Sequence, residues 1–209
     1  MRNWSENKVK LIMIRPTVSN KEHRYLGKTD EALSEEGISY LKRAKYTNVH
    51  PDVDYLFSSP MKRCLETAEI LYPSKEPVII PEWEEMDFGA FEGKNYAELQ
   101  SDKRYKSWID SNGTLPFPEG ESRENFIARC EKGFHRMLKV LSALLCEECH
   151  PAITIGLIVH GGTIMSLLNR YHGGEYFDYQ VANGSGYICT LKGSIGKPEI
   201  VMIEKIKGE

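Results

Sequence analysis

The stretch Val9-Lys10-Leu11-Ile12-Met13-Ile14-Arg15-Pro16-Thr17-Val18-Ser19-Asn20 contains a short apolar run that ends in an arginine and a proline. The aliphatic and β-branched side chains of residues 9–14 favour a buried strand. Pro16 lacks a backbone N–H, so we expect the strand to end before it. A second apolar run, from Ile153 to Val159, ends in His160-Gly161-Gly162-Thr163. Each run therefore predicts a buried strand that leads directly into residues suited to ligand binding.

Helices and further strands are predicted between and after these two runs. Ser34-Glu35-Glu36 has the N-cap residue and the acids of a helix start, and Ser59 is expected to cap a helix that has Pro60 at its first position. Apolar spacing from Arg123 to about Cys146 predicts a long amphipathic helix. The other predicted strands cover residues 54–57, 78–80, 187–191 and 199–205. Strands that alternate with helices predict an α/β fold, here a three-layer α/β/α sandwich around a mainly parallel sheet.

In such a sheet, ligands bind beyond the carboxyl ends of the strands. Arg15, Ser58-Ser59 and His160 each follow a predicted strand, so we expect them at one rim. Arg63 falls in the first turn of a predicted helix, where backbone N–H groups also favour an anion. The planar guanidinium stays charged and donates two hydrogen bonds to one phosphate, while Gly161 allows close approach of the backbone. These positions predict an anion-binding site.

In order and spacing, these segments resemble the histidine phosphatase superfamily, the phosphoglycerate-mutase-like phosphatases, from about Val9 to Leu191. The resemblance also includes Ser58-Ser59-Pro60-Met61-Lys62-Arg63 and Glu84-Glu85-Met86-Asp87-Phe88-Gly89. In the family the first strand normally ends in Arg-His-Gly-x-Thr-x-x-Asn, whereas here Arg15 is followed by Pro16-Thr17-Val18-Ser19-Asn20. Inserting His-Gly after Arg15 would restore the pattern. The histidine that the family phosphorylates is therefore missing from this chain, and the simplest description is a two-residue deletion.

The resemblance implies a phosphoglycerate-mutase-like fold and a set of site residues. It implies that His160 contacts the phosphoryl group as part of the catalytic set. The residues that it implies for substrate binding are Arg15, Asn20, Arg63 and Gly161.

Glu85 is the residue that the resemblance implies as the general acid, which protonates the leaving oxygen. A carboxyl group beside apolar side chains can have a raised pKa, which suits this role. Glu84, Asp87 and Glu92 lie nearby, and the register of the family pattern selects Glu85.

No residue at the first strand end replaces the missing nucleophile. The nitrogen of Pro16 belongs to an amide, and Thr17 has no adjacent base. His23 or His160 would need close alignment with the phosphorus, since ~1 Å of misplacement can cost ~10²-fold in rate. Two functional classes are therefore open. The protein is either a phosphomonoesterase that is inactive or nearly so because it lacks His-Gly, or a natural pseudoenzyme that binds phosphorylated ligands or a protein partner.

Residues 88–122 are predicted to form a lid over the site. The segment is rich in aromatic residues: Phe88, Phe91, Tyr96, Tyr105, Trp108 and Phe117. With Arg24-Tyr25-Leu26-Gly27-Lys28-Thr29-Asp30 and the Pro-Phe-Pro-x-Gly-Glu-Ser stretch, it resembles most the α-ribazole-5′-phosphate phosphatase branch, which acts in cobalamin biosynthesis. An aromatic lid suits a flat benzimidazole, but these aromatics can also simply pack a helical insert against the body. A mutase is disfavoured, because the chain looks short for the insertions of those enzymes.

Composition limits the remaining classes. A chain of 209 residues fits one domain, residues 1–209, and a net charge of −3 argues against nucleic-acid partners. With no apolar stretch of ~18 residues and no apolar leader, we expect a cytoplasmic protein without a membrane partner. Cys146-Glu147-Glu148-Cys149-His150 has haem or half-zinc spacing, but a zinc site needs more ligands, so no metal or cofactor is expected. The expected ligand is a small-molecule phosphate ester.

Overall fold

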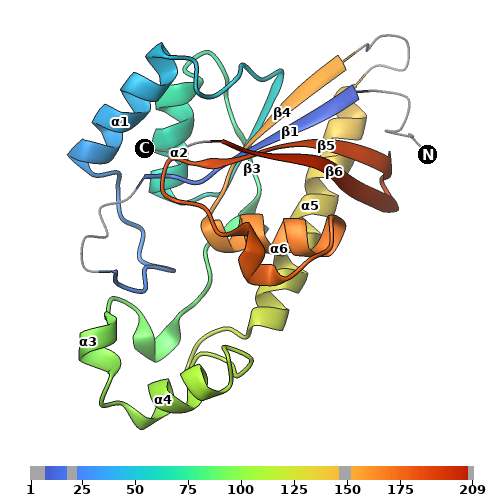
Figure 1. Cartoon of the computed structure of the whole chain (residues 1–209). Helices are drawn as coiled ribbons and strands as arrows, with labels where there is room; N and C mark the ends of the chain where they lie inside the picture. Colours follow the sequence, from blue (N-terminus) through green and yellow to red (C-terminus); the bar gives the residue numbers. More distant parts are fainter. Residues whose placement is uncertain (1–7, 18–22, 146–151, 207–209) are drawn as a thin grey trace.

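The computed structural model describes residues 8–17, 23–145 and 152–206 of the chain, shown in Figure 1. The predicted ligand Asn20 lies outside the described residues, as does the motif formed by Cys146, Cys149 and His150. Every other predicted site residue lies within them.

One six-stranded sheet runs through the molecule, in the order β3-β2-β4-β1-β5-β6. The strands are β1 (Lys8–Ile14), β2 (Tyr55–Ser58), β3 (Val78–Ile79), β4 (Ala152–Ile158), β5 (Gly186–Ser194) and β6 (Lys197–Ile206). The pairs β1/β4, β2/β4 and β2/β3 are parallel. Each parallel strand was predicted from its apolar run, and the α/β fold is confirmed.

The last two strands differ from a fully parallel sheet. β5 pairs antiparallel with β1, and β6 pairs antiparallel with β5, so the sheet is mixed. Only Ile195 and Gly196 separate β5 from β6, whereas a parallel connection needs a crossover of a dozen or more residues. The short connection therefore forces a hairpin at this edge.

Helices cover both faces of the sheet (Figure 1). Val9, Leu11 and Met13 of β1 share a core with α5 (Arg123–Leu144) and α6 (Gly161–Tyr171). Ile12 and Ile14 point to the opposite core, with α1 (Glu35–Tyr46) and α2 (Lys62–Leu71). Alternate residues of a strand face opposite sides. The three-layer arrangement therefore follows from one continuous apolar strand that is buried on both faces.

The starts of α1 and α5 were predicted correctly, whereas the start of α2 differs from the prediction. The hydroxyl oxygens of Ser34 and Ser122 accept hydrogen bonds from backbone N–H groups in the first turns of α1 and α5. Ser59 does not cap α2, which begins at Lys62 with Met61 as its N-cap. The Ser59 hydroxyl accepts a hydrogen bond from the backbone N–H of Met61 at 3.4 Å and also contacts a histidine ring, described below, at the sheet rim.

The segment 88–122 contains η2 (Gly89–Phe91), α3 (Tyr96–Leu99) and α4 (Lys103–Asp110), and α3 and α4 lie apart from the sheet in Figure 1. Two further short 3₁₀ helices are η1 (Pro81–Trp83) and η3 (Tyr176–Tyr179). Phe91, Tyr105 and Phe117 are buried and belong to the same apolar cluster as the sheet face under α5. The aromatic side chains therefore join this segment to the body. Within the described ranges, no helix is long and apolar enough to cross a membrane.

Candidate functional site

Three neighbouring parallel strands deliver the predicted residues to one rim of the sheet. β1 ends before Arg15, β2 ends before Ser59, and β4 ends before His160. Because β2, β4 and β1 are adjacent, their carboxyl ends lie side by side. The prediction that these distant segments meet is confirmed.

A pocket of about 150 Å³ lies at this rim, and we call it the polar pocket. The predicted residues Arg15, Arg63, Glu85, His160 and Gly161 all line it. Arg24, Tyr25, Leu26, Phe88 and Pro16 complete its wall. Three arginines, a carboxyl group and a helix N-terminus thus face one small cavity.

The ring of His160 is buried, with 2% of its surface exposed, and both of its nitrogens contact protein groups. Nδ1 accepts a hydrogen bond from Nε of Arg63 at 3.3 Å. This requires the proton of a neutral ring to be on Nε2, which lies 2.8 Å from Oγ of Ser59. Burial, with the nearby Arg63 and Arg15, holds the pKa of His160 well below its usual value. The ring is therefore neutral, and a phosphate group would have to displace Ser59 to reach Nε2.

Arg63 makes two more hydrogen bonds, which connect it to the loop after β1. Its terminal nitrogens donate to the carbonyl oxygens of Thr29 at 2.9 Å and Gly27 at 3.0 Å. A guanidinium has five N–H donors, so two remain for a ligand. Glu92 holds the same loop, because its Oε1 accepts from the backbone N–H groups of Gly27 and Thr29. Arg63 is thus fixed in place by backbone carbonyls and not by a carboxylate.

Arg15 is positioned by the loop that precedes β5. Its backbone pairs with Gly184 and Ser185, and its side chain donates to the carbonyl oxygen of Val181 at 2.5 Å. Burial lowers the pKa of Arg15, an effect that Glu85 opposes and Arg63 adds to. The side chain packs against Gly161, where an added Cβ would lie 3.4 Å from Nε of Arg15. The arginine therefore faces the pocket although the strand-end turn is short.

Glu85 differs from the three carboxylates that sequence reasoning left as alternatives. Glu84 is exposed, Asp87 forms an ion pair with Lys28 at 2.7 Å, and Glu92 binds the loop as described. Of these four, Glu85 alone lines the polar pocket. Burial raises the pKa of Glu85, and the N–H of Met86 and the nearby arginines limit the rise. A buried carboxyl group with a raised pKa can hold a proton for transfer.

The N-terminus of α6 meets Glu85, and glycine makes this contact possible. A Cβ at Gly162 would lie 2.7 Å from Oε1 of Glu85 and 2.9 Å from the ring of Phe126. Any larger residue would therefore push Glu85 out of place. The double glycine after His160 lets the first turn of α6 approach both the carboxyl group and a bound anion.

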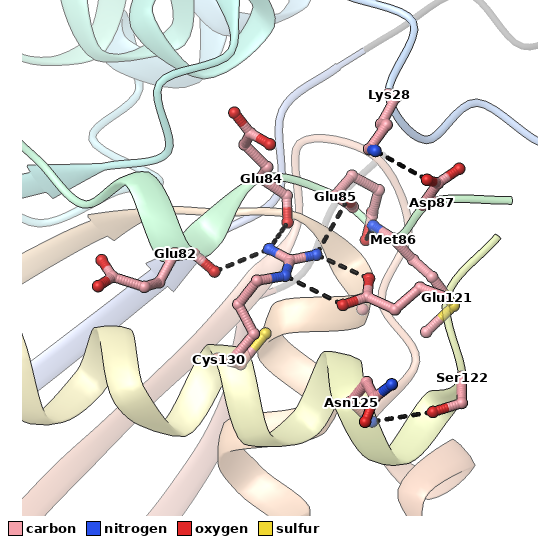
Figure 2. Close-up of polar contacts among 12 residues, drawn as sticks. Lys28, Glu82, Glu84, Glu85, Met86, Asp87, Glu121, Ser122, Asn125 and Cys130 are labelled. Carbon is pink, nitrogen blue, oxygen red and sulfur yellow. Dashed lines mark hydrogen bonds and ion pairs between the residues drawn. The ribbon is translucent and has the colours of Figure 1, made fainter. Parts of the chain in front are cut away.

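Arg129, on α5, holds the backbone on which Glu85 lies. It donates to the carbonyl oxygens of Glu82 at 2.8 Å, Glu84 at 2.9 Å and Glu85 at 3.4 Å. It also binds both carboxylate oxygens of Glu121, at 3.1 and 2.8 Å. In Figure 2, dashed lines from Glu82, Glu84 and Glu121 converge on a single guanidinium. This arginine thus connects α5, the segment that contains Glu85 and the end of the aromatic segment.

A larger cavity of about 390 Å³ adjoins the polar pocket, and we call it the apolar chamber. The two cavities share Arg15, Tyr25, Glu85, Phe88 and Gly161. The rest of the chamber wall is mainly apolar and aromatic and includes Met86, Trp108, Phe117, Met165, Tyr176, Phe177 and Val181. The cleft therefore has a charged end and an apolar end.

Some of the lining residues were not predicted as site residues. Arg123, Tyr176 and Phe177 line the chamber from the start of α5 and from η3. The adjacent aromatic pair after α6 was the only sequence signal for η3. His23 is exposed and is not among the described residues that line either cavity. The described segments contain no group of three or more possible metal ligands.

Comparison with known sequences identifies a family. The family model of the histidine phosphatase superfamily (branch 1) matches residues 14–203 of the chain. The 2,3-bisphosphoglycerate-dependent phosphoglycerate mutase of Bifidobacterium longum is 31% identical over 194 residues, which cover 76% of this chain and 75% of the mutase. Phosphoserine phosphatase 1 of Hydrogenobacter thermophilus is 31% identical over 132 residues, 60% of this chain and 62% of that protein. Both a mutase and a phosphatase are therefore similar in sequence.

Comparison with solved structures agrees on the fold. A proposed alpha-ribazole-5′-P phosphatase from Escherichia coli superimposes with a TM-score of 0.75, covering 95% of this chain and 97% of that one. The two sequences are 21% identical, so this likeness concerns the fold alone.

Proposed function

The chain belongs to the histidine phosphatase superfamily, and from this premise we propose that its cleft binds phosphate monoesters as a phosphomonoesterase site that lacks its nucleophile. The observation that carries this proposal is the convergence of Arg15, Arg63, Glu85, His160 and Gly161 on the polar pocket. The two arginines and the first turn of α6 would hold the phosphate group, since they supply charge-assisted and backbone hydrogen bonds. Glu85 would then face the leaving oxygen of the ester.

Without the nucleophilic histidine, the site can stabilise the charge on a phosphoryl group but cannot form the covalent phosphohistidine. Phosphoryl transfer depends mainly on positioning and on stabilising charge on the phosphoryl oxygens. Arg15 and Arg63 would stabilise the charge on the phosphoryl oxygens, and a protonated Glu85 would donate a proton to the leaving oxygen. The residue directly after Arg15 is a proline and not a histidine. The neutral ring of His160 already contacts Arg63 and Ser59. We expect binding to persist and turnover to be slow.

Phosphate binding is the first test. Titration calorimetry with inorganic phosphate should detect binding to the parent chain, and Arg63→Gln should weaken it at least about tenfold, because a charge-assisted hydrogen bond is lost. Arg170→Gln is the matched control, since this arginine lies on the surface and pairs with Glu131. No binding at millimolar phosphate would remove the proposed function.

Turnover is the second test. Hydrolysis of p-nitrophenyl phosphate should rise on the order of 10³-fold or more when His-Gly is inserted between Arg15 and Pro16, because loss of a covalent nucleophile has effects of at least this size in other enzymes. A parent chain that is already as fast as the extended one would contradict the missing nucleophile. Trapping of a phosphohistidine at His23 or His160 would then identify the residue that acts.

For the substrate, we propose α-ribazole-5′-phosphate or a similar ester with a flat leaving group, which would place the protein in cobalamin biosynthesis in the cytoplasm. Support comes from the aromatic wall of the apolar chamber and from the fold likeness to the Escherichia coli protein. Residues 88–122 would act as the lid, because Phe88, Trp108 and Phe117 supply part of that wall. Hydrolysis of α-ribazole-5′-phosphate by the extended chain, compared with 3-phosphoglycerate and phosphoserine, is the measurement that decides.

A pseudoenzyme that binds phosphorylated ligands or a partner protein is the second candidate. The contacts of both ring nitrogens of His160 support it, since the ring is held by Ser59 and Arg63. This candidate predicts phosphate binding in both chains and slow turnover even after His-Gly is inserted.

A further inference from the structure

Arg123 is a cation that lines the apolar chamber but not the polar pocket, where His160 and Arg63 lie. It is the first residue of α5 and is half-buried in the wall of the apolar chamber. Its guanidinium carbon lies 5.7 Å from the ring centre of Tyr176 and 5.8 Å from that of Phe177. The two rings are perpendicular, with centres 5.1 Å apart. Cation–π contacts on two rings therefore hold the guanidinium in place and leave its N–H edge unused.

Arg123 makes no ion pair or hydrogen bond with any residue that the structure describes. Several other arginines have a carboxylate partner within 3.4 Å: Arg24, Arg104, Arg129, Arg136 and Arg170. Partly desolvating a cation without an anion is unfavourable, and a bound anion removes this cost. Arg15 and Arg63, which line the polar pocket, likewise have no hydrogen bond to a carboxylate of the described residues. Arg123 thus resembles Arg15 and Arg63 in having no carboxylate partner among the described residues, and it differs from the paired arginines, of which Arg24 also lines the polar pocket.

The charge balance of the cleft allows a second anion. Arg15, Arg123 and Glu85 all line the apolar chamber. The single carboxyl group of Glu85 can balance at most one of the two arginines in this wall. A phosphate group in the polar pocket would neutralise Arg15 and Arg63, whereas Arg123 lines only the chamber.

We propose that Arg123 binds a second negatively charged group of the same ligand, a carboxylate or a second phosphate at the distal end of a phosphate monoester with an apolar body. This inference rests on the proposed function, because the phosphate end must occupy the polar pocket. The shared wall of the two cavities lets one ligand span them, with its apolar part against Phe88, Trp108 and Phe117. A neutral leaving group, such as that of α-ribazole-5′-phosphate, would leave Arg123 without an anion, so an ester of similar shape that carries a second anionic end should bind more tightly.

The test uses phosphonates, which bind as phosphate esters do but cannot be hydrolysed. Phenylphosphonate is compared with a series that carries a para carboxylate directly or through one to three methylene groups. In the parent chain, the best carboxylate member should bind about tenfold more tightly than phenylphosphonate, because a charge-assisted hydrogen bond forms. In Arg123→Gln this affinity ratio should fall to about one. In Arg123→Lys it should lie between the two values, since lysine keeps the positive charge but lacks the paired N–H donors of the guanidinium.

Arg104→Gln is the matched control, because this exposed arginine pairs with Asp102 outside the cleft, and it should keep the parent ratio. A parent chain that binds phenylphosphonate but prefers no carboxylate at any length overturns the role of Arg123 alone. A preference that survives in Arg123→Gln does the same. Failure to bind inorganic phosphate and phenylphosphonate overturns the proposed function, and this inference falls with it.

Discussion

Nε of Arg63 donates a hydrogen bond to Nδ1 of His160 at 3.3 Å, so a fixed positive charge lies beside a buried imidazole. The proton of the neutral ring is then on Nε2, against the hydroxyl of Ser59. In this arrangement the histidine cannot accept a proton without placing two cations in contact. The pair therefore sets both the tautomer and the charge of His160 at neutral pH.

The stability of the protein should depend on pH through His160. Its pKa in the folded state is below the usual value, so the unfolded chain takes up the proton first as the pH falls. The free energy of unfolding should therefore decrease below about pH 6.5, by at most about 1.4 kcal/mol per pH unit from this group. Urea unfolding of parent and His160→Gln between about pH 5 and 8 measures this, and the variant should show the weaker dependence.

Nitrogen-detected NMR of the parent gives an independent check. The His160 ring should stay neutral, with the proton on Nε2, throughout that range. Titration of the ring near its ordinary pKa would contradict the contact with Arg63.

Glu85 should affect stability with the opposite sign. Its folded pKa is raised by burial, so its contribution to stability is greatest in acid and is lost as the pH rises through that pKa. Glu85→Gln should therefore be at least as stable as the parent at about pH 8, with the difference shrinking toward acid. Thermal unfolding across the pH range tests this. A variant that is less stable than the parent at alkaline pH only would show that the arginines outweigh burial.

Arg129 should be needed for the order of the Glu85 segment. Arg129→Ala removes the hydrogen bonds to three carbonyl groups and leaves the carboxylate of Glu121 unpaired. Because the site is half-buried, we expect a loss of about 2 kcal/mol in the free energy of unfolding. Arg129→Lys should recover little, since an ammonium group cannot bind both oxygens and the carbonyls together. Arg104→Ala, an exposed control, should change stability very little, and equal effects of both alanine variants would refute the prediction.

Gly162→Ala should disturb the site by crowding. The new Cβ would lie 2.7 Å from Oε1 of Glu85, so the carboxyl group or Phe126 must move, at an expected cost of about 1–3 kcal/mol. In the chain with His-Gly inserted, turnover should fall as well, because Glu85, which we propose as the general acid, is displaced. Gly196→Ala is the matched control, since no atom lies within 4 Å of its added Cβ. Unchanged stability and turnover in Gly162→Ala would mean that the contact with Glu85 is not tight.

Strand ends could be read from the sequence because their signals are local. An apolar run followed by Pro16 or by Gly161 marks where a buried strand must stop, and the chain order of Arg15, Arg63 and His160 is that of the family. Since parallel strands end at one rim, the meeting of these residues could be predicted without coordinates. The same local patterns identified the cap Ser34 and the start of the long helix at Arg123.

Contacts between distant residues were decided only in the folded structure. Ser59 has the sequence of a helix cap, yet its hydroxyl binds His160, because two adjacent strand ends bring them to 2.8 Å. Likewise, Glu85 and the three acidic residues near it look alike in sequence, and burial and the partners of each carboxylate distinguish them. Residues far apart in the chain, such as Arg123 and Tyr176, have no shared local pattern at all. Local propensity and apolar spacing thus determined where the elements and their ends lie, whereas side-chain partners, burial and charge balance depended on packing between segments that only the tertiary fold brings together.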